Sequence, residues 1–524
     1  MTDRFKLAYI GAGSFRFSIG FFRNITNATE LIPMEVALCD IDAHSLSLMT
    51  RILKRMVTVG AIRKHYKESD VLVTSSTDRE TVLDNADFVY KSISVGLQAA
   101  EWFDLYLPLK FGIPQNTGDS VGPGGLFRGL RSAPPCAGIA KDMKKLCPKA
   151  PLLSYTNPVS SCTLAARTTA PEIQFIGLCH ELFEGMKLLR RFYNKREQKH
   201  IKHWRDIQVE YAGVNHFGWL TRIEYKGEDL YPVLRKNAHQ LVLDRFRGRD
   251  AANGFNFYLL EKTGCFPFPG ARHVAEFLPD YYNAFNHEKK DQCPYWSFPF
   301  IRSVWRVHDE RRFVYSVFRL WAKRMIPVLG PKKEGEWAME MTIDWRRDKP
   351  TEYVVNVPNH GTVPELPNNC IVEIPGYFKN GEMRPLKKIH VPKKVAGYLV
   401  PHCDQQLLTV NAALGNNPDL VIKAMLHDPM NKWIEDDEKI EYLTKLMLFY
   451  EQAWLPKQWK EWIPKKEELK KSNYWVSLVE LSNRGNAYLV KKFPPRKELQ
   501  SKAFFWEPTE TPKAGGIINE TRSS

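Results

Sequence analysis

Over the first 180 residues, short apolar or β-branched segments alternate with amphipathic stretches. Strands are predicted at 7–10, 35–39, 71–74, 88–93, 152–155 and 175–178, and helical runs such as 45–59 and 137–146 lie between them. This alternation predicts an α/β fold with a doubly wound parallel sheet and right-handed crossovers. A ligand should then bind beyond the carboxyl ends of the strands.

The pattern changes after about residue 190. Residues 205–225 are predicted as β-strands and 353–400 as short antiparallel strands. Residues 404–453 are predicted as helical, with Leu407, Leu408, Ala412 and Leu414 spaced for one buried face. We therefore predict a parallel-sheet domain at 1–195, a second α+β domain at 196–455 and a basic extension at 456–524. The last dozen residues of the extension are expected to be disordered.

Composition narrows the functional class. The chain has 524 residues, 44% of them hydrophobic, which is enough for two packed cores. It has no apolar run long enough to cross a membrane and no signal-peptide pattern at its start, so a cytoplasmic protein without a membrane partner is predicted. Nine scattered cysteines favour reduced thiols.

The formal net charge of +16 raises the question of nucleic acid binding. The segment after Leu455 holds 14 Lys and Arg against 8 Asp and Glu, so it contributes about +6 of the total. The remaining charge is spread thinly, and the sequence has no recognisable nucleic-acid module. No specific nucleic-acid partner is predicted.

The first predicted strand runs into a glycine-rich turn that contains Gly11, Gly13, Ser14 and Phe15. Two glycines allow a backbone to approach a pyrophosphate closely at a helix N-terminus. The third glycine of the usual fingerprint is replaced by an arginine, but Asp40 ends the second strand, where a carboxylate can accept hydrogen bonds from both ribose hydroxyls. These residues predict a Rossmann-type domain that binds NAD rather than NADP. A helix-capping role remains the alternative for Asp40.

Two later segments carry side chains that bind metals. Cys179 and His180 close a predicted strand, and Asn215 and His216 follow in another turn. A thiolate and an imidazole from separate loops can hold a divalent ion and leave coordination positions open for substrate. Two ligands are too few to define a site, so a buried cysteine near a surface histidine remains the alternative.

Taken together, these segments resemble glycoside hydrolase family 4, the NAD- and divalent-metal-dependent glycosidases, over roughly the first 455 residues. The matching stretches are GAGS (11–14), DID (40–42), NTGDSVGPGGLFR (116–128), YTNP (155–158), CHE (179–181), VNH (214–216), VNVPN (355–359) and HDP (427–429). The resemblance implies a layout like that of lactate and malate dehydrogenases. It also implies NAD and a divalent metal, with manganese expected, as cofactors.

The implied mechanism differs from hydrolysis by two carboxylates. NAD takes a hydride from C3 of the sugar, and the metal polarises the resulting ketone. A base then removes the acidified C2 proton and the glycosidic oxygen is eliminated. Water adds at C1, and the bound NADH reduces C3 again.

Carried over residue by residue, the resemblance makes Cys179 and His216 the metal ligands. Asn157 and Asn215 are expected to face the substrate, and His180 is expected to contact the sugar or to assist the leaving group. The sequence Cys-His-Glu at 179–181 resembles members that act on unphosphorylated glucosides, galactosides or uronides. The substrate is therefore expected to be a small unphosphorylated hexoside or hexuronide.

Two residues of the glycine-rich segment at 116–128 are further candidates. Asp119 is assigned a catalytic role and Arg128 a role in substrate binding. For each of them, a role as a loop anchor is an open alternative.

The chain departs from the family at its proton-abstracting residue. Where members that act on unphosphorylated sugars often have Gly-Asp-Arg-His, this chain has Gly-Ala-Arg-His at 270–273, so the base falls on Ala271. Tyr281 and Tyr282 are predicted to act as catalytic residues in its place. Arg272 and His273 are predicted to bind substrate, and His273 is a further candidate for the base.

Two other functions stay open at this point. The first is a plain NAD-dependent dehydrogenase of a sugar or a 2-hydroxy acid, which would accumulate NADH instead of returning the hydride. The second is a protein that binds NAD and sugar without catalysis, after loss of the base at 271. The resemblance also implies a homodimer or a homotetramer.

Overall fold

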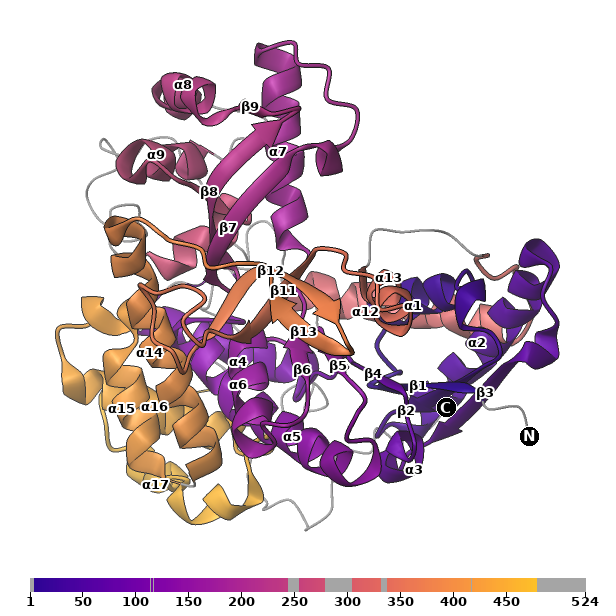
Figure 1. Cartoon of the computed structure of the whole chain (residues 1–524). Coiled ribbons are helices and arrows are strands. Elements are labelled where there is room, and N and C mark those ends of the chain that lie inside the picture. Colours follow the sequence, from indigo (N-terminus) through magenta and orange to yellow (C-terminus); the bar gives the residue numbers. More distant parts are fainter. Residues whose placement is uncertain are drawn as a thin grey trace.

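The computed structural model describes residues 4–113, 115, 117–243, 254–278, 304–330, 337–415 and 417–477. Its strands form one mixed sheet (Figure 1). They are β1 (Phe5–Ile10), β2 (Met34–Cys39), β3 (Val71–Ser76), β4 (Phe88–Lys91), β5 (Leu152–Ser154), β6 (Phe175–Gly177), β7 (Gln208–Val214), β8 (Phe217–Tyr225), β9 (Glu228–Asp229), β10 (Phe266–Phe268), β11 (Tyr353–Pro358), β12 (Ile371–Lys379) and β13 (Glu382–Pro385).

The first half of the chain forms the parallel part of this sheet. The strand order is β3-β2-β1-β4-β5-β6, which is the order of doubly wound dinucleotide-binding folds. All six strands predicted from the sequence are present. The α/β fold with a Rossmann-type sheet is confirmed.

The second half adds antiparallel strands to the free edge of β6. The order continues β6-β11-β12-β7-β8-β10, with β9 beside β8 and β13 beside β12. Two residue pairs connect these strands. Asn356 of β11 pairs with Gly177 of β6, and Glu373 of β12 pairs with Gly213 of β7. Both pairs lie close to the candidate active site.

Helices cover both faces of the sheet and build the part of the molecule around α14–α17 (Figure 1). They are α1 (Ser18–Ile25), α2 (Ala43–Lys64), α3 (Arg79–Leu83), α4 (Leu97–Lys110), α5 (Gly122–Leu146), α6 (Val159–Thr169), α7 (Glu181–Arg196), α8 (Tyr231–Leu243), α9 (Gly254–Thr263), α10 (Ala271–Val274), α12 (Val304–Ala322), α13 (Trp337–Arg346), α14 (Lys393–Gly415), α15 (Pro418–His427), α16 (Asp437–Glu451) and α17 (Lys466–Leu469). The short 3-10 turns used below are η5 (Ala275–Phe277), η6 (Pro429–Trp433) and η7 (Lys457–Trp462). Among the described residues, none of the helices has the length and apolarity needed to cross a membrane.

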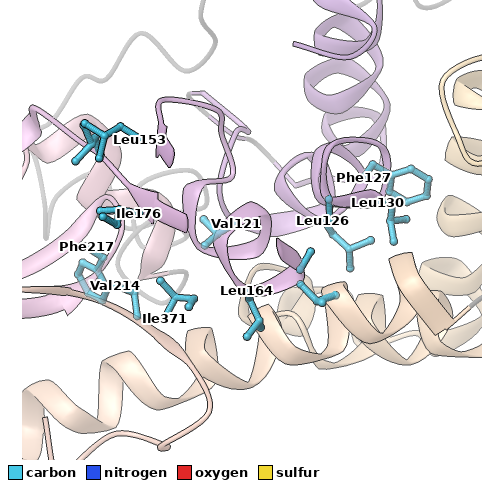
Figure 2. Close-up of a cluster of buried hydrophobic side chains, with 14 of the residues drawn as sticks. Val121, Leu126, Phe127, Leu130, Leu153, Leu164, Ile176, Val214, Phe217 and Ile371 are labelled. Carbon is cyan, nitrogen blue, oxygen red and sulfur yellow. The ribbon is translucent and has the colours of Figure 1, made fainter. Parts of the chain in front are cut away.

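The alternation of side chains along each parallel strand creates two apolar cores. In β1, Leu7 and Tyr9 face one core, and Ala8 and Ile10 face the other. Figure 2 shows the first core where α5, α6 and α14 meet the sheet, with Val121 and Val214 next to the loops of the site. The close packing of Val121 and Val214 in this core fixes the positions of the loops next to them, which carry the candidate active-site residues.

Two expectations about the second half need correction. Residues 393–400 are not strand, because α14 begins at Lys393 with Val395, Ala396 and Leu399 on its buried side. Of the four residues predicted for the buried face of α14, Ala412 is buried, whereas Leu407, Leu408 and Leu414 are only partly buried. The buried side of α14 combines apolar residues with polar ones, which are His402, Gln405, Gln406 and Thr409.

The start of the basic extension is ordered against the helical part of the molecule. Trp459 of η7 and Leu469 of α17 are buried, and the Tyr442 hydroxyl donates to the carbonyl of Leu469 at 2.7 Å. The expected disorder of the last dozen residues concerns a segment outside the described residues. The domain boundaries near 195 and 455 stay predictions.

Candidate active site

The glycine-rich turn after β1 has the geometry of a nucleotide loop. Gly11 has a φ of +89°, and a Cβ there would lie 2.4 Å from the carbonyl oxygen of Ser92, at the end of β4. A Cβ on Gly13 would lie 2.7 Å from Oδ2 of Asp40. Only glycine fits at either position, which leaves backbone exposed where a pyrophosphate could approach.

Asp40 is held against this turn and does not cap α2. Its Oδ2 accepts from the Gly13 N–H at 2.8 Å, and its Oδ1 accepts from the Asp42 N–H at 3.0 Å. The capping residue is Asp42, which accepts from the N–H of His44. The capping alternative for Asp40 is therefore wrong. A carboxylate at the carboxyl end of the second strand fits a ribose of a dinucleotide.

Ser14 and Phe15 continue the turn beneath α12. The Tyr315 hydroxyl of that helix donates to the carbonyl of Gly13 at 2.6 Å, and its ring lies 6.5 Å from the ring of Phe15. Ser14 Oγ accepts from the N–H of Phe17 at 3.3 Å. Helix α12 thus fixes the outer side of the nucleotide loop, a contact that the sequence did not reveal.

A polar cluster lies beyond the carboxyl ends of β5 and β6. Cys179 follows β6, Asp119 precedes α5, and His216 is in the two-residue turn between β7 and β8. His216 has a φ of +66°, a conformation that a non-glycine residue rarely adopts and that is enriched at functional sites. His216 Nδ1 lies 3.5 Å from Oδ1 of Asp119, and the Ser120 hydroxyl lies 2.8 Å from that oxygen and 2.9 Å from the imidazole nitrogen.

Two further predicted residues join this cluster. Asn157 Nδ2 donates to Oδ2 of Asp119 at 2.9 Å. The ring of His273 in α10 lies 4.7 Å from that of His216 and is tilted by 37°, and the candidate ligand atoms of Asp119, His216 and His273 all lie within 4.8 Å of one another. Five elements that are far apart in sequence therefore meet at one point, which has the donor types of a divalent metal site.

The electrostatics of the cluster support negative charge on Asp119. Burial raises the pKa of this carboxyl, but the hydrogen bond and the positive charge of His216 outweigh it and hold the pKa well below the usual value. Burial lowers the pKa of His216, but Cys179 and Asp119 together raise it well above its usual value. Burial raises the pKa of the Cys179 thiol to about 11, and the charge of Glu373 adds to this effect. A divalent cation would favour the thiolate.

A second layer of polar residues, absent from the sequence prediction, supports this cluster. Glu373 of β12 is completely buried, and its Oε2 accepts from Asn215 at 2.9 Å and from Asn356 at 3.0 Å. Burial raises the pKa of Glu373. A charged residue inside the apolar run 371–374 was the signal that could have identified it.

Glu276 of η5 fixes the loop that carries Asp119. Its carboxylate accepts from the backbone N–H groups of Thr117 and Gly118, and its side chain is 2% exposed. The same short segment carries His273, so Glu276 links two parts of the cluster. The sequence analysis assigned no role to Glu276.

Other predicted residues are less closely tied to the cluster. His180 is exposed at the N-cap of α7, and in the described part of the chain its side chain has no hydrogen bond to the cluster. Arg128 of α5 is partly buried, and its charge helps to lower the pKa of Asp119. Ala271 is buried at the start of α10. The side chain of Arg272, and all of Tyr281 and Tyr282, lie outside the described residues.

Comparisons with known proteins identify the family of this chain. The model of family 4 glycosyl hydrolases matches residues 6–194, and the model of the family's C-terminal domain matches residues 211–431. An alpha-galacturonidase from Lachnoclostridium phytofermentans is 30% identical over 469 residues, which cover 87% of this chain and 97% of that protein.

Solved structures share the fold. The putative glucosidase lplD from Bacillus subtilis superposes with a TM-score of 0.75 and 29% identity, covering 85% of this chain and all of that one. A 6-phospho-alpha-glucosidase from gut microorganisms, solved in complex with NAD and Mn2+, has a TM-score of 0.69 and 21% identity over 87% of this chain and 99% of its own. Both family models together cover well over half of the sequence. The chain belongs to glycosyl hydrolase family 4.

Proposed function

We propose that this member of the family is an NAD- and manganese-dependent glycosidase that acts on unphosphorylated α-galacturonides or closely related hexosides. One observation carries the proposal. A nucleotide loop at Gly11–Gly13 follows β1, and a cluster of Cys179, His216 and Asp119 lies beyond β5 and β6, so both are at carboxyl ends of strands in the same parallel sheet.

The residues present fit both cofactors. Gly11, Gly13, Ser14 and Phe15 would hold the pyrophosphate end of NAD, and Asp40 would accept from the ribose. Cys179 and His216 would hold the metal, because a thiol and an imidazole converge there with a charged carboxylate close by. When bound, NAD exchanges a hydride with C3 of the sugar and Mn2+ polarises the C3 oxygen.

The remaining polar residues orient the reacting groups. Asp119 and Ser120 contact Nδ1 of His216 and fix the direction of its ring. Asn157 is anchored to Asp119, and Asn215 is anchored to Glu373. The buried carboxylate of Glu276 holds the Thr117–Gly118 backbone, so the loop does not have to reorganise when substrate binds.

A base for the C2 proton must come from a residue other than Ala271, which cannot accept a proton. Among the described residues, His273 is the candidate for this base, because its ring lies next to that of His216 and its Nε2 is 3.8 Å from Oε1 of Glu181. Tyr281 and Tyr282 stay candidates from the sequence. Single substitutions Tyr281→Phe, Tyr282→Phe and His273→Ala, each assayed for exchange of the C2 proton, separate the three.

Support for the sugar class comes from two sources. The alpha-galacturonidase relative matches this chain over nearly its whole length. The Cys-His-Glu sequence at 179–181 also resembles members that act on unphosphorylated sugars. We expect the purified chain with NAD and Mn2+ to release p-nitrophenol from the α-galacturonide at least about tenfold faster than from the α-galactoside or the α-glucoside, a difference of about 1.4 kcal/mol in the activation barrier.

The same panel should include 6-phosphorylated glucosides. Preferential cleavage of a phosphorylated substrate would contradict the proposed sugar class and leave the family chemistry in place. Accumulation of NADH without release of p-nitrophenol would instead show a dehydrogenase.

Replacing Asp40 by alanine should weaken NAD binding by about 1–3 kcal/mol, because charge-assisted hydrogen bonds to the ribose are lost. It should also reduce the preference for NAD over NADP, whose 2′-phosphate the carboxylate repels. Titration of both dinucleotides by isothermal calorimetry measures this. Asp42→Ala is the matched control, since it removes the neighbouring cap of α2 and should leave the NAD/NADP ratio unchanged. Equal affinities in the wild type would remove the cofactor assignment.

A further inference from the structure

A buried lysine and two buried cysteines form a cluster outside the candidate active site. Lys91 ends β4, Cys136 is in α5 and Cys162 is in α6. The two helices pack against each other, and all three residues are fully buried. The chemistry proposed for the candidate active site uses none of the three side chains.

Lys91 points into an apolar core. Side chains alternate along a strand, so Lys91 shares its face of β4 with Val89, which belongs to the core that also contains Cys136, Cys162 and Phe175. The Lys91 ammonium lies 5.3 Å from the centre of the Phe175 ring. Among the described residues, its one hydrogen bond goes to Sγ of Cys136 at 2.8 Å. A buried ammonium needs a counter-charge, and the thiolate of Cys136 is the group in position to provide it.

The two cysteines of the cluster differ in their protonation. Burial raises the pKa of the Cys136 thiol, but the hydrogen bond from Cys162 and the charge of Lys91 outweigh burial and lower the pKa to about 6. The hydrogen bond to Cys136, together with burial, raises the pKa of Cys162 well above its usual value. At neutral pH the cluster therefore contains a thiolate at Cys136 and a thiol at Cys162 that donates to it.

We propose that this cluster is a modification site for hydrogen peroxide, at which Cys136 is the attacking thiolate, Cys162 is the resolving thiol and Lys91 is the activating cation. The thiolate is the reactive form of cysteine, and a neighbouring cation favours it. A second thiol in contact with the first converts the initial oxidation product into a disulfide. The structure holds both cysteines in the reduced state that this reaction starts from.

The reaction has two steps. In the first, Sγ of Cys136 attacks one oxygen of the peroxide, so that an S–O bond forms and the O–O bond breaks. The departing hydroxide takes a proton from the Lys91 ammonium and leaves as water. In the second step, the sulfur of Cys162 attacks Sγ of Cys136, the S–S bond forms and the S–O bond breaks. Hydroxide leaves with the Cys162 proton as a second water.

This sequence of steps also balances the buried charge. The two sulfurs together lose two electrons, and the peroxide gains two as it becomes water. The thiolate at Cys136 disappears, and Lys91 becomes a neutral amine in the same reaction. The oxidised cluster therefore leaves no unpaired charge in the apolar core.

The chain offers a second cysteine pair as an internal control. Cys370 precedes β12 and Cys403 is in α14, and both are fully buried. The hydrogen bond with Cys370, together with burial, raises the pKa of Cys403 well above its usual value. Among the described residues, neither thiol has a hydrogen bond to a lysine or an arginine. The control pair matches the cluster in burial and lacks its cation.

The test uses the full chain with bound NAD and Mn2+, treated with hydrogen peroxide at about pH 7. The remaining thiols are alkylated in denaturant after catalase has removed the peroxide, and the peptides are identified by mass spectrometry. We expect a disulfide between Cys136 and Cys162 to form at least about tenfold faster than one between Cys370 and Cys403, because only the first pair holds an activated thiolate. Dithiothreitol should reverse it.

Three variants separate the roles within the cluster. Lys91→Met removes the ammonium and keeps an apolar side chain in the core, so it should slow the oxidation of Cys136 at least about tenfold. Cys162→Ala should leave Cys136 as a sulfenic acid that dimedone labels. Lys144→Met is the matched control, because Lys144 is an exposed lysine of α5 paired with Glu172, and the rate of disulfide formation should stay unchanged.

The comparison within the wild-type chain does not depend on the folding of any variant. Equal oxidation rates in the two cysteine pairs would overturn the proposal, and so would a Cys136 that stays reduced while the control pair oxidises. Oxidation of Lys91→Met at the wild-type rate would also overturn it, because the cation would then have no part in the reaction.

Discussion

Replacing Cys179 by serine should lower turnover by about 10³-fold, a loss of about 4 kcal/mol of transition-state stabilisation, and added Mn2+ should not restore it. The thiol lies beside His216 at the carboxyl end of β6, and its burial leaves it protonated unless a metal is bound. Serine keeps the shape of the side chain but provides a much poorer ligand. Turnover and bound manganese, measured on the same samples, should fall together.

Cys147→Ser is the control for this substitution. Cys147 is another free thiol, buried at the end of α5, and it is not part of the cluster. Its replacement should leave metal content and turnover unchanged. Full turnover of Cys179→Ser, or full turnover of the wild type after chelation, would contradict the metal role.

Arg131→Met should destabilise the protein by about 3–5 kcal/mol, because it leaves two buried carboxylates without a counter-charge. The guanidinium NH1 bonds to Asp104 at 2.8 Å and to Glu451 at 2.7 Å, and all three side chains are at most 1% exposed. These ion pairs of Arg131 connect α5 to α4 and α16. Urea denaturation followed by circular dichroism measures the loss.

The control and the pH dependence separate this effect from a general loss of packing. Arg79→Met breaks the ion pair between Arg79 of α3 and Asp142 of α5, but Arg79 is 40% exposed, so its loss should cost less than about 1 kcal/mol. Burial and the charge of Asp104 raise the pKa of Glu451 well above its usual value. Groups with a raised pKa favour folding at low pH and lose that contribution as pH rises. The defect of Arg131→Met should therefore be larger at pH 8 than at pH 5, and a pH-independent defect would contradict the explanation.

The parallel half of the fold was predictable because its signals are local. Each strand is a short apolar run, each is followed by an amphipathic helix, and the turn at Gly11–Gly13 has a steric requirement that only glycine meets. The antiparallel half was predicted less well. Residues 393–400 were mistaken for strand, because a helix that starts with a short apolar stretch has the same local pattern.

The candidate site was predictable where its residues belong to motifs. Asp119, Asn157, His216 and His273 were identified in this way, and the structure brings them together. Their supports were not predicted, because the partners are distant in sequence. Glu373 reaches the site only through the pairing of β12 with β7.

The buried polar residues of α14 were not predicted for a related reason. The sequence analysis looked for apolar residues at helical spacing, and such a pattern does not identify buried polar side chains. The packing of α14 against α5, α6 and α15 buries Gln405 and Thr409 together with Val410 and Ala412.

The central claim is that this chain cleaves glycosides by oxidation and elimination, without a pair of catalytic carboxylates. The most direct measurement is turnover of an α-galacturonide in D2O with catalytic amounts of NAD and Mn2+, followed by NMR of the released sugar. The account predicts deuterium at C2 of the product and no accumulation of NADH, because the C2 proton leaves during elimination and the hydride returns to C3. A product that keeps its original hydrogen at C2 would contradict the account.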